Sequence, residues 1–263
     1  MLGAVIGDIV GSPYEFGGIK SKDFPLFASG CRPTDDSIMT IAVGSACVHS
    51  DVSDEDDFKS TLIRSMRQLG NTYRDAGYGG RFYRWLINDK MKAYGSYGNG
   101  SAMRVSPVAY AAETLEEVEK LAKWSAEVTH DHPDGIAGAK AVAGSIFLAR
   151  TGASKEEIGK YVEDNYYALD FTLDEIRPGY SFDVTCRGSV PEAIKCFLES
   201  EDYEDALRNA VSLGGDSDTQ AAIAGAIAEA YYGIPEDIAA EGLGYLDDTL
   251  KELYYEYSED LYR

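Results

Sequence analysis

Two short, oxygen-rich turns contain the residues of this sequence that are best suited to chemistry. Residues 34–37 read TDDS and residues 216–219 read DSDT, and each turn stands directly before an apolar stretch with helical spacing. Carboxylates and hydroxyls with no Cys or His beside them suit Mg²⁺, Mn²⁺ or Ca²⁺ better than Zn²⁺. Asp, Ser and Thr are also the ordinary residues at helix N-caps, so simple capping is the alternative interpretation.

The elements that must position these turns are helices. We expect one helix over residues 38–48 and another, rich in small residues, that continues to Gly233. In the second helix Ala222, Gly225 and Ala226 share one face, which allows it to pack closely within a core. Two acidic turns at the positive ends of two buried helices would let a helical bundle hold metal ions between helix ends.

Helical periodicity dominates the rest of the chain, and alternating strand patterns are scarce. We therefore expect an all-α protein, a single compact multi-helix bundle with one domain over residues 1–263, because the candidate chemistry comes from both ends of the chain. Gly3, Gly7 and Gly11 predict a buried first helix that closely approaches another, and Asp8 within it must be paired or hydrogen-bonded. Further helices are expected at 54–69, 81–88, 114–128, 136–150, 154–165, 190–198, 203–213 and 243–262, with a short one after Pro235 and an irregular, functional segment at 166–190.

Two other polar motifs have both a structural and a functional interpretation. Gly98 and Gly100 could let backbone amides face a phosphate, with Ser101 starting the next helix, although a glycine turn with a Ser cap explains the same residues. Two of the three histidines, His130 and His132, stand just before the helix expected at 136–150. Too few N or S ligands accompany them for a zinc site, so we expect a capping or a ligand-binding histidine there.

Composition limits the classes of partner. The net charge of −21 argues against nucleic acid or an anionic membrane surface as the main partner. The first sixteen residues are apolar but lack a basic segment and contain Asp8, so we expect neither a signal peptide nor a membrane span. The four cysteines have no paired spacing, which favours free thiols and a cytoplasmic location.

Five stretches, taken in this order, resemble the ADP-ribosylglycohydrolase family, which includes the dinitrogenase reductase-activating glycohydrolases. Together they extend over nearly the whole chain, and each is weaker alone than the five in sequence. The resemblance implies an all-α fold of the ADP-ribosylglycohydrolase type. The stretches are GxxxGDxxGxxxE (residues 3–15), TDDS (34–37), GNGSAMR (98–104), THxHP (129–133) and GGDSDTxAAIxGA (214–226).

The resemblance also implies roles for individual residues around two divalent cations, Mg²⁺ or Mn²⁺. Ser37 and Ser217 stand where many relatives have Thr, but both keep a hydroxyl. The implied general base is Asp36 or Glu15. The implied metal ligands are Glu15, Thr34, Asp35, Asp36, Asp216, Asp218 and Thr219, and the implied substrate contacts are Gly98, Asn99, Gly100, Ser101, Met103 and His130.

A cluster of five carboxylates requires either protons or cations. Two charges about 4 Å apart repel by about 4 kcal/mol at an effective dielectric near 20, far more than a helix terminus returns. The implied enzyme is a metal-dependent hydrolase that cleaves the glycosidic bond of ADP-ribosylated protein side chains through an oxocarbenium-like transition state and releases ADP-ribose. Two alternatives remain, namely a hydrolase of a small ADP-ribose adduct and a non-catalytic ADP-ribose binder or structural relative.

Overall fold

The computed structural model describes residues 1–262, and these residues are organised almost entirely by helices. Within this range the β-structure is limited to an isolated bridge between Gly98 and Thr185, so the all-α prediction is confirmed. The helices are α1 (Leu2–Gly11), η1 (Ser12–Tyr14), α2 (Asp35–His49), α3 (Glu55–Thr72), α4 (Gly80–Leu86), α5 (Gly100–Met103), η2 (Ser106–Tyr110), α6 (Leu115–Glu127), α7 (Pro133–Arg150), α8 (Lys155–Asn165), α9 (Leu173–Ile176), α10 (Cys186–Leu198), α11 (Tyr203–Ser212), α12 (Ser217–Tyr232), α13 (Glu236–Gly244) and α14 (Asp248–Leu261).

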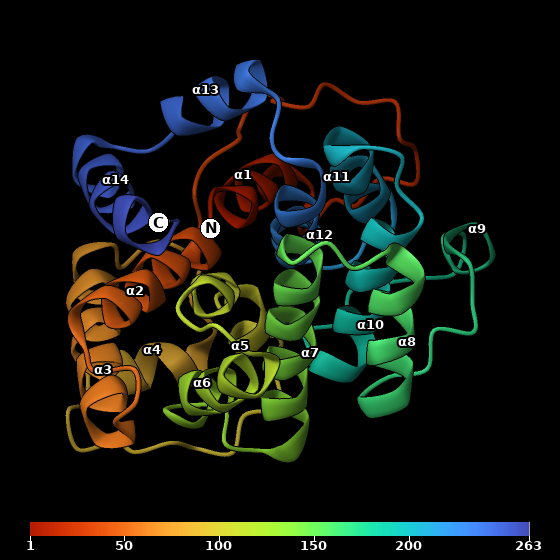
Figure 1. Cartoon of the computed structure of the whole chain (residues 1–263). Helices are drawn as coiled ribbons and strands as arrows, with labels where there is room; N and C mark the ends of the chain where they lie inside the picture. The colour runs from red at the N-terminus through yellow and green to blue at the C-terminus, as the bar shows by residue number, and fades with distance from the viewer. Residues whose placement is uncertain (263) are drawn as a thin grey trace.

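Helices α1 and α12 pack against each other near the centre of the bundle (Figure 1). Every residue of α1 is buried. A Cβ added at Gly7 would lie 2.0 Å from the carbonyl oxygen of Ala221, and one added at Gly3 would lie 2.3 Å from that of Gly225. Only glycine allows two helix backbones to approach this closely, so the predicted tight packing of the first helix is confirmed.

The remaining helices surround this central pair. In Figure 1, α2, α3 and α4 lie on one side of it and α8, α10 and α11 on the other. The two ends of the described chain lie side by side, because the α-amino group of Met1 donates a hydrogen bond to the Tyr262 hydroxyl at 2.7 Å. The N-terminal ends of α2 and α12, which carry the two acidic turns, meet within the same bundle as a result of this arrangement.

Local sequence signals explain where several helices begin. Thr114, Ser154 and Thr172 each form a capping box, in which the hydroxyl accepts a hydrogen bond from the N3 backbone amide and the N3 glutamate accepts one from the cap. Asp54 caps α3 by accepting from two backbone amides. The caps at Thr114, Ser154 and Asp54 fix three amphipathic outer helices at the starts that the sequence predicts, whereas Thr172 caps the short helix α9, which was not predicted.

The irregular segment at 166–190 is shorter than its sequence suggests. It contains the single-turn helix α9, and α10 begins at Cys186 rather than at Val190. Pro191 lies inside α10, although proline usually stands in the first turn of a helix. The Thr185 hydroxyl caps α10 by accepting a hydrogen bond from the Gly188 amide.

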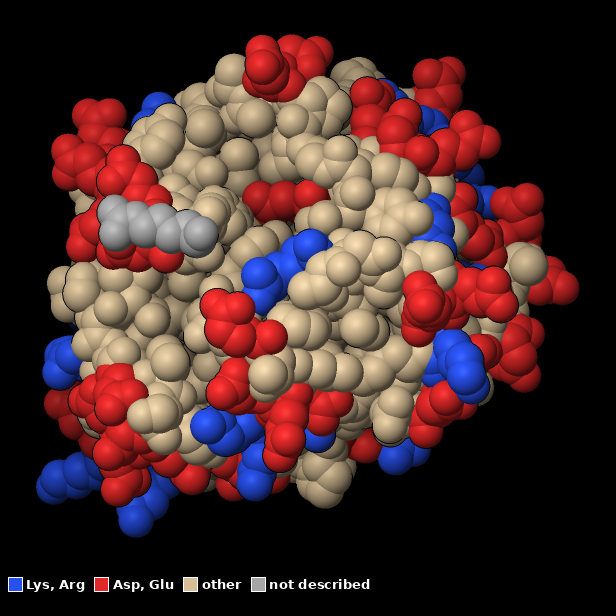
Figure 2. All heavy atoms as spheres, in the orientation of Figure 1, with Lys and Arg blue, Asp and Glu red and all other residues tan. Residues whose placement is uncertain are grey.

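Acidic side chains are spread over most of the visible surface, with fewer Lys and Arg residues between them (Figure 2). This distribution accords with the net charge of −21. All four cysteines are buried free thiols, as predicted. None of the helices formed by residues 1–262 is both long enough and apolar enough to cross a membrane.

Candidate active site

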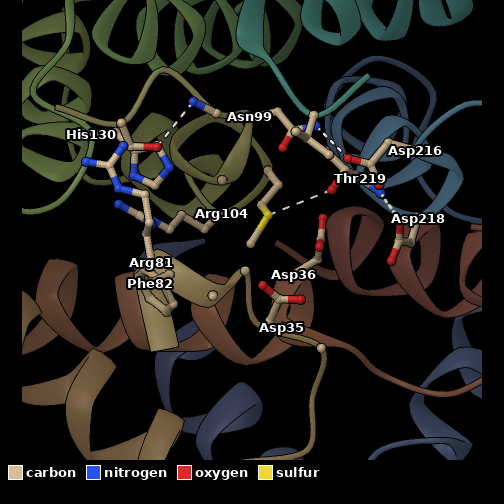
Figure 3. A pocket seen from close by; sticks show the side chains of 18 of the residues that line it. Asp35, Asp36, Arg81, Phe82, Asn99, Arg104, His130, Asp216, Asp218 and Thr219 are labelled. Atoms are coloured by element: carbon tan, nitrogen blue, oxygen red, sulfur yellow. Dashed lines mark hydrogen bonds between the residues drawn. The ribbon is translucent and has the colours of Figure 1, made fainter. Parts of the chain in front are cut away.

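A cavity of about 380 Å³ opens beside the N-terminal ends of α2 and α12, which carry the two acidic turns. This volume falls in the range of small-molecule sites. One end of the cavity is acidic and the other carries arginine, histidine and aromatic side chains (Figure 3). Its lining includes Glu15, Asp35, Asp36, Gly98, Asn99, Gly100, Met103, His130, Asp216, Asp218 and Thr219, and also Arg81, Phe82, Tyr94, Arg104, Phe182 and Val184.

The acidic end is built from parts of the chain that are far apart in sequence. Carboxylate oxygens of Asp8, Asp36 and Asp218 lie within 4.8 Å of one another, and so do those of Glu15, Asp216 and Asp218. Asp218 belongs to both sets and thereby joins them. The N-terminal segment and the two acidic turns therefore meet in one cluster.

The electrostatics of this cluster are those expected of crowded, buried acids. Burial raises the pKa of Asp36 and of Asp218 well above the usual range, and neighbouring carboxylates raise both further. Burial, with the charges of Asp8 and Asp216, raises the pKa of Asp35 to about 8. Burial, with the charge of Asp216, raises the pKa of the half-buried Glu15 to about 7. At neutral pH such a cluster must either retain protons or bind cations.

The donor set fits a divalent cation. The Oδ1 atom of Asp36 is buried and has no hydrogen-bond partner within residues 1–262, which is costly for a carboxylate unless a cation approaches it. All candidate donors at this end are oxygens, which Mg²⁺ and Mn²⁺ prefer. Asp216 stands at the N-cap of α12 but makes no capping bond, and its Oδ2 instead accepts a hydrogen bond from Asn99 at 2.8 Å. Capping alone therefore does not account for Asp216.

Asp8 supports the first acidic turn from inside α1. Its Oδ1 accepts a hydrogen bond from the Thr34 hydroxyl at 2.6 Å, and its Oδ2 accepts from the backbone amides of Thr34 and Ser37 and from the Ser37 hydroxyl. These four bonds satisfy the sequence requirement that Asp8 be partnered. They also hold residues 34–37 in place beside the cluster, as outer carboxylates commonly do around metal ligands.

The chain has relatives along its whole length. The ADP-ribosylglycohydrolase family matches residues 1–263. The chain belongs to the ADP-ribosylglycohydrolase family. Membership supports a hydrolase of ADP-ribose glycosidic bonds, and the buried acidic cluster is the place where ions could bind.

Individual members of the ADP-ribosylglycohydrolase family are distant from this chain. Human ADP-ribosylhydrolase ARH3 is 28% identical to this chain in an alignment 316 residues long, which covers 90% of this chain and 85% of that protein. The ADP-ribosyl-[dinitrogen reductase] glycohydrolase of Rhodospirillum rubrum is 28% identical over 269 residues, which cover 94% and 88%. A solved structure described as an ADP-ribosylglycohydrolase-related protein complex superposes with a TM-score of 0.66 at 23% identity, over 98% of this chain and 95% of that one, and this likeness shows the fold.

Most of the residues implied by the family motifs gather at the cavity, but two of them do not line it. The hydroxyl of Thr34 donates to Asp8 and accepts from the Asp36 amide at 3.3 Å, so Thr34 caps α2. The hydroxyl of Ser101 is fully buried and donates to the carbonyl oxygen of Gly135 at 2.7 Å. Asn99, and not Ser101, is the N-cap residue of α5.

The sequence left two roles open for the neighbouring histidines, helix capping and ligand binding, and the structure places one histidine in each setting. His132 is the N-cap of α7 and accepts a hydrogen bond from the Asp134 amide at 3.1 Å. His130 instead lines the cavity. Arg81, Tyr94 and Phe182 also line the cavity, although they lie outside the five motifs. Phe182 belongs to the segment at 166–190 that the sequence predicts to be functional, whereas sequence reasoning did not single out Arg81.

Proposed function

We propose that the chain is a divalent-metal-dependent hydrolase that releases ADP-ribose from an ADP-ribosylated side chain or a small adduct. The observation that carries this proposal is the pair of carboxylate sets that share Asp218 at one end of a single cavity. Family membership supports the substrate class. The names of the relatives include protein substrates, such as dinitrogen reductase for the Rhodospirillum rubrum protein, so a modified protein is the first candidate substrate.

We propose Asp36, Asp216 and Asp218 as the central metal ligands, with Glu15, Asp35 and Thr219 completing the candidate set, whereas Thr34 caps α2 and does not line the cavity. Bound Mg²⁺ or Mn²⁺ would offset the negative charge of the cluster and orient ribose hydroxyls. Thr219 keeps its side chain at the cavity, with its hydroxyl 3.8 Å from the Met103 sulfur. Asn99 orients Asp216 by donating a hydrogen bond to its Oδ2.

A carboxylate of this chain would take a proton from water as that water attacks the anomeric carbon. The bond from that carbon to the acceptor nitrogen or oxygen breaks, and the acceptor keeps the electron pair and takes up a proton from water. Glu15 suits the role of the base, because it is half-buried and lines the cavity, where its carboxylate can reach a water molecule. Asp36 is the second candidate, since its Oδ1 has no partner within the described chain. The remaining cavity residues would bind the nucleotide, with Gly98 and Gly100 leaving room for it along the wall.

The test is release of ADP-ribose from a panel of adducts, comprising modified Arg and Ser peptides and small ADP-ribose esters, with Mg²⁺ or Mn²⁺. We expect turnover of at least one adduct, and a loss of about 10²-fold or more in kcat for Asp36→Ala and for Asp216→Ala. Asp23→Ala is a matched control, because Asp23 is an exposed carboxylate outside the cavity. Full activity in the Asp36→Ala, Asp216→Ala double variant would refute the proposed site, and ADP-ribose binding without turnover of any adduct would favour a non-catalytic binder.

A further inference from the structure

The end of the cavity opposite the carboxylates contains two arginines that no carboxylate neutralises. Arg81 and Arg104 both line the cavity, and neither forms an ion pair with an acidic residue within residues 1–262. Together with Tyr94, Thr129 and His130 these arginines make up what we call the basic end of the cavity.

Arg104 is almost completely buried, with 1% of its surface exposed. Its Nη2 donates hydrogen bonds to the carbonyl oxygen of Ser125 at 3.2 Å and to the Thr129 hydroxyl at 2.9 Å, and its Nε has no partner in the described chain. A buried guanidinium needs acceptors, because it cannot lose its charge at physiological pH. Thr129 is therefore fixed as an acceptor toward Arg104.

The hydroxyl hydrogen of Thr129 must go elsewhere. The Thr129 oxygen lies 2.7 Å from Nδ1 of His130, and no other acceptor for this hydroxyl is found among residues 1–262. Because Arg104 can only donate, the hydroxyl is free to donate to Nδ1. Nδ1 then carries no proton, and in a neutral imidazole the proton must be on Nε2. Burial lowers the pKa of His130 well below its usual value, so the ring is neutral.

The Nε2 atom of His130 faces the glycine turn of the cavity wall. A methyl group placed on Gly100 would lie 3.2 Å from Nε2, and one placed on Gly98 would lie 3.7 Å from it. Within residues 1–262 nothing accepts a hydrogen bond from Nε2, although His130 is only 5% exposed. Nε2 is therefore an N–H donor at the cavity wall without an acceptor in the described chain, and it is suited to a ligand oxygen.

Arg81 adds a cation beside this donor. Its guanidinium lies 4.9 Å from the centre of the Tyr94 ring, and its Nη2 donates to the carbonyl oxygen of Tyr94 at 2.5 Å. These contacts hold the side chain over the cavity and leave other guanidinium N–H groups available. Figure 3 shows the Arg81 guanidinium next to the His130 ring, at the end away from Asp216 and Asp218.

The family resemblance already implies that His130 contacts the substrate. We infer that Arg104 and Thr129 fix the tautomer of this histidine, so that it is an Nε2–H donor, and that Arg81 joins it in binding a phosphate of the diphosphate group in the substrate. The inference rests on the proposed function for the identity of the ligand. Arg81 is a substrate-binding residue in this scheme, and Arg104 and Thr129 are positioning residues that act through His130. Placing the anionic group at the basic end keeps it away from the carboxylates and directs the far ribose toward them.

Two measurements on the metal-free protein test this inference without any turnover. The first is a long-range ¹H–¹⁵N spectrum of the imidazoles, which reports the tautomer of each ring; with three histidines in the chain, His130 is assigned by its loss in His130→Gln. We expect an unprotonated Nδ1 in the wild type and in Thr129→Ser, and a shifted or mixed tautomer in Thr129→Val. A wild-type His130 with its proton on Nδ1 would overturn the inference whether or not any variant folds.

The second measurement is calorimetric binding of ADP and of adenosine in the presence of a chelator. We expect Arg81→Gln to weaken ADP binding by about tenfold or more, and to leave adenosine binding unchanged, because a charge-assisted bond to phosphate is lost. Arg84→Gln is the matched control, since Arg84 lies on the same short helix and outside the cavity. Equal loss of ADP and adenosine binding in Arg81→Gln, or no loss of either, would refute the role of Arg81.

These outcomes are separable from those of the proposed function. If no ADP-ribose adduct is hydrolysed but the tautomer and the ADP preference are as expected, the basic end is a phosphate subsite in a protein of another activity. If adducts are hydrolysed but His130 carries its proton on Nδ1 or Arg81→Gln binds ADP normally, the hydrolase stands and this inference is wrong.

Discussion

The close approach of α1 to α12 predicts a large effect for a single added methyl group. In Gly7→Ala the new Cβ would lie 2.0 Å from the carbonyl oxygen of Ala221, 2.3 Å from its carbonyl carbon and 2.6 Å from the Ala222 amide nitrogen. Ordinary van der Waals contact begins near 3.4 Å. All three neighbours are backbone atoms, so no side chain can rotate away, and the two helices must separate by roughly 1 Å or more.

This separation has two consequences of known size. Overpacking of a core lowers the free energy of unfolding by about 1–3 kcal/mol. Because the new methyl group meets backbone atoms that cannot move aside, we expect a loss at the upper end of this range, about 3 kcal/mol or more. The same shift would move Asp8, on α1, away from Asp218, on α12, and a ligand set displaced by about 1 Å loses metal affinity. We therefore expect both a lower free energy of unfolding and a weaker response to Mn²⁺.

The assay is denaturant unfolding with and without Mn²⁺. Gly244→Ala is the matched control, because Gly244 is the last residue of α13 and a Cβ there meets nothing within 4 Å. Alanine should be neutral or favourable at that position, by up to about 1 kcal/mol. If Gly7→Ala unfolds at the same denaturant concentration as the wild type, the two helices are not as close as described and the account of the core is wrong.

Two further predictions concern the cluster and the loops beside it. Metal-free protein should be less stable at pH 8 than at pH 5. The cause is that acids of the cluster, such as Asp35 with its pKa raised by burial to about 8, keep protons in the folded state that the unfolded chain releases above about pH 4. Thermal unfolding in a chelator measures this effect, and saturation with Mg²⁺ at about 100 times its Kd should add about 2.7 kcal/mol to the free energy of unfolding. An unchanged or rising stability toward pH 8 in the chelator would contradict the raised pKa values. Lys20→Met should speed amide exchange around Tyr180 and Leu213, because the carbonyl oxygens of these residues accept hydrogen bonds from the Lys20 Nζ. Lys22→Met is the control and should leave exchange there unchanged, since Lys22 pairs with Asp205 instead. Hydrogen-exchange mass spectrometry tests this, and equal exchange in both variants would show that Lys20 does not hold these segments.

Much of the fold is predictable from local signals in the sequence. Helix starts follow from hydroxyl and carboxylate caps such as Thr114 and Asp54, whose bonds involve residues only two or three positions away. The glycines of α1 predict a close helix partner, and the structure identifies that partner as α12. The early start of α10 was not predictable, because the tertiary structure accommodates Pro191 within the helix.

The site is predictable only where its residues lie in a recognisable motif. The two acidic turns stand out in the sequence because crowded carboxylates repel one another and require protons or cations. The sequence predicts that Asp8 needs a hydrogen-bonding partner, but it does not say which. The structure shows that the four donors come from Thr34 and Ser37 in the first acidic turn. Arg81 carries no local signal, because its role depends on how separate segments meet at the cavity.

The anomalous scattering of a crystal grown with Mn²⁺ is the most direct test of the central claim. The account predicts manganese peaks in contact with Asp36, Asp216 and Asp218, within the cavity that also contains His130. Their absence at saturating Mn²⁺, or peaks confined to acidic side chains on the outer surface, would contradict it.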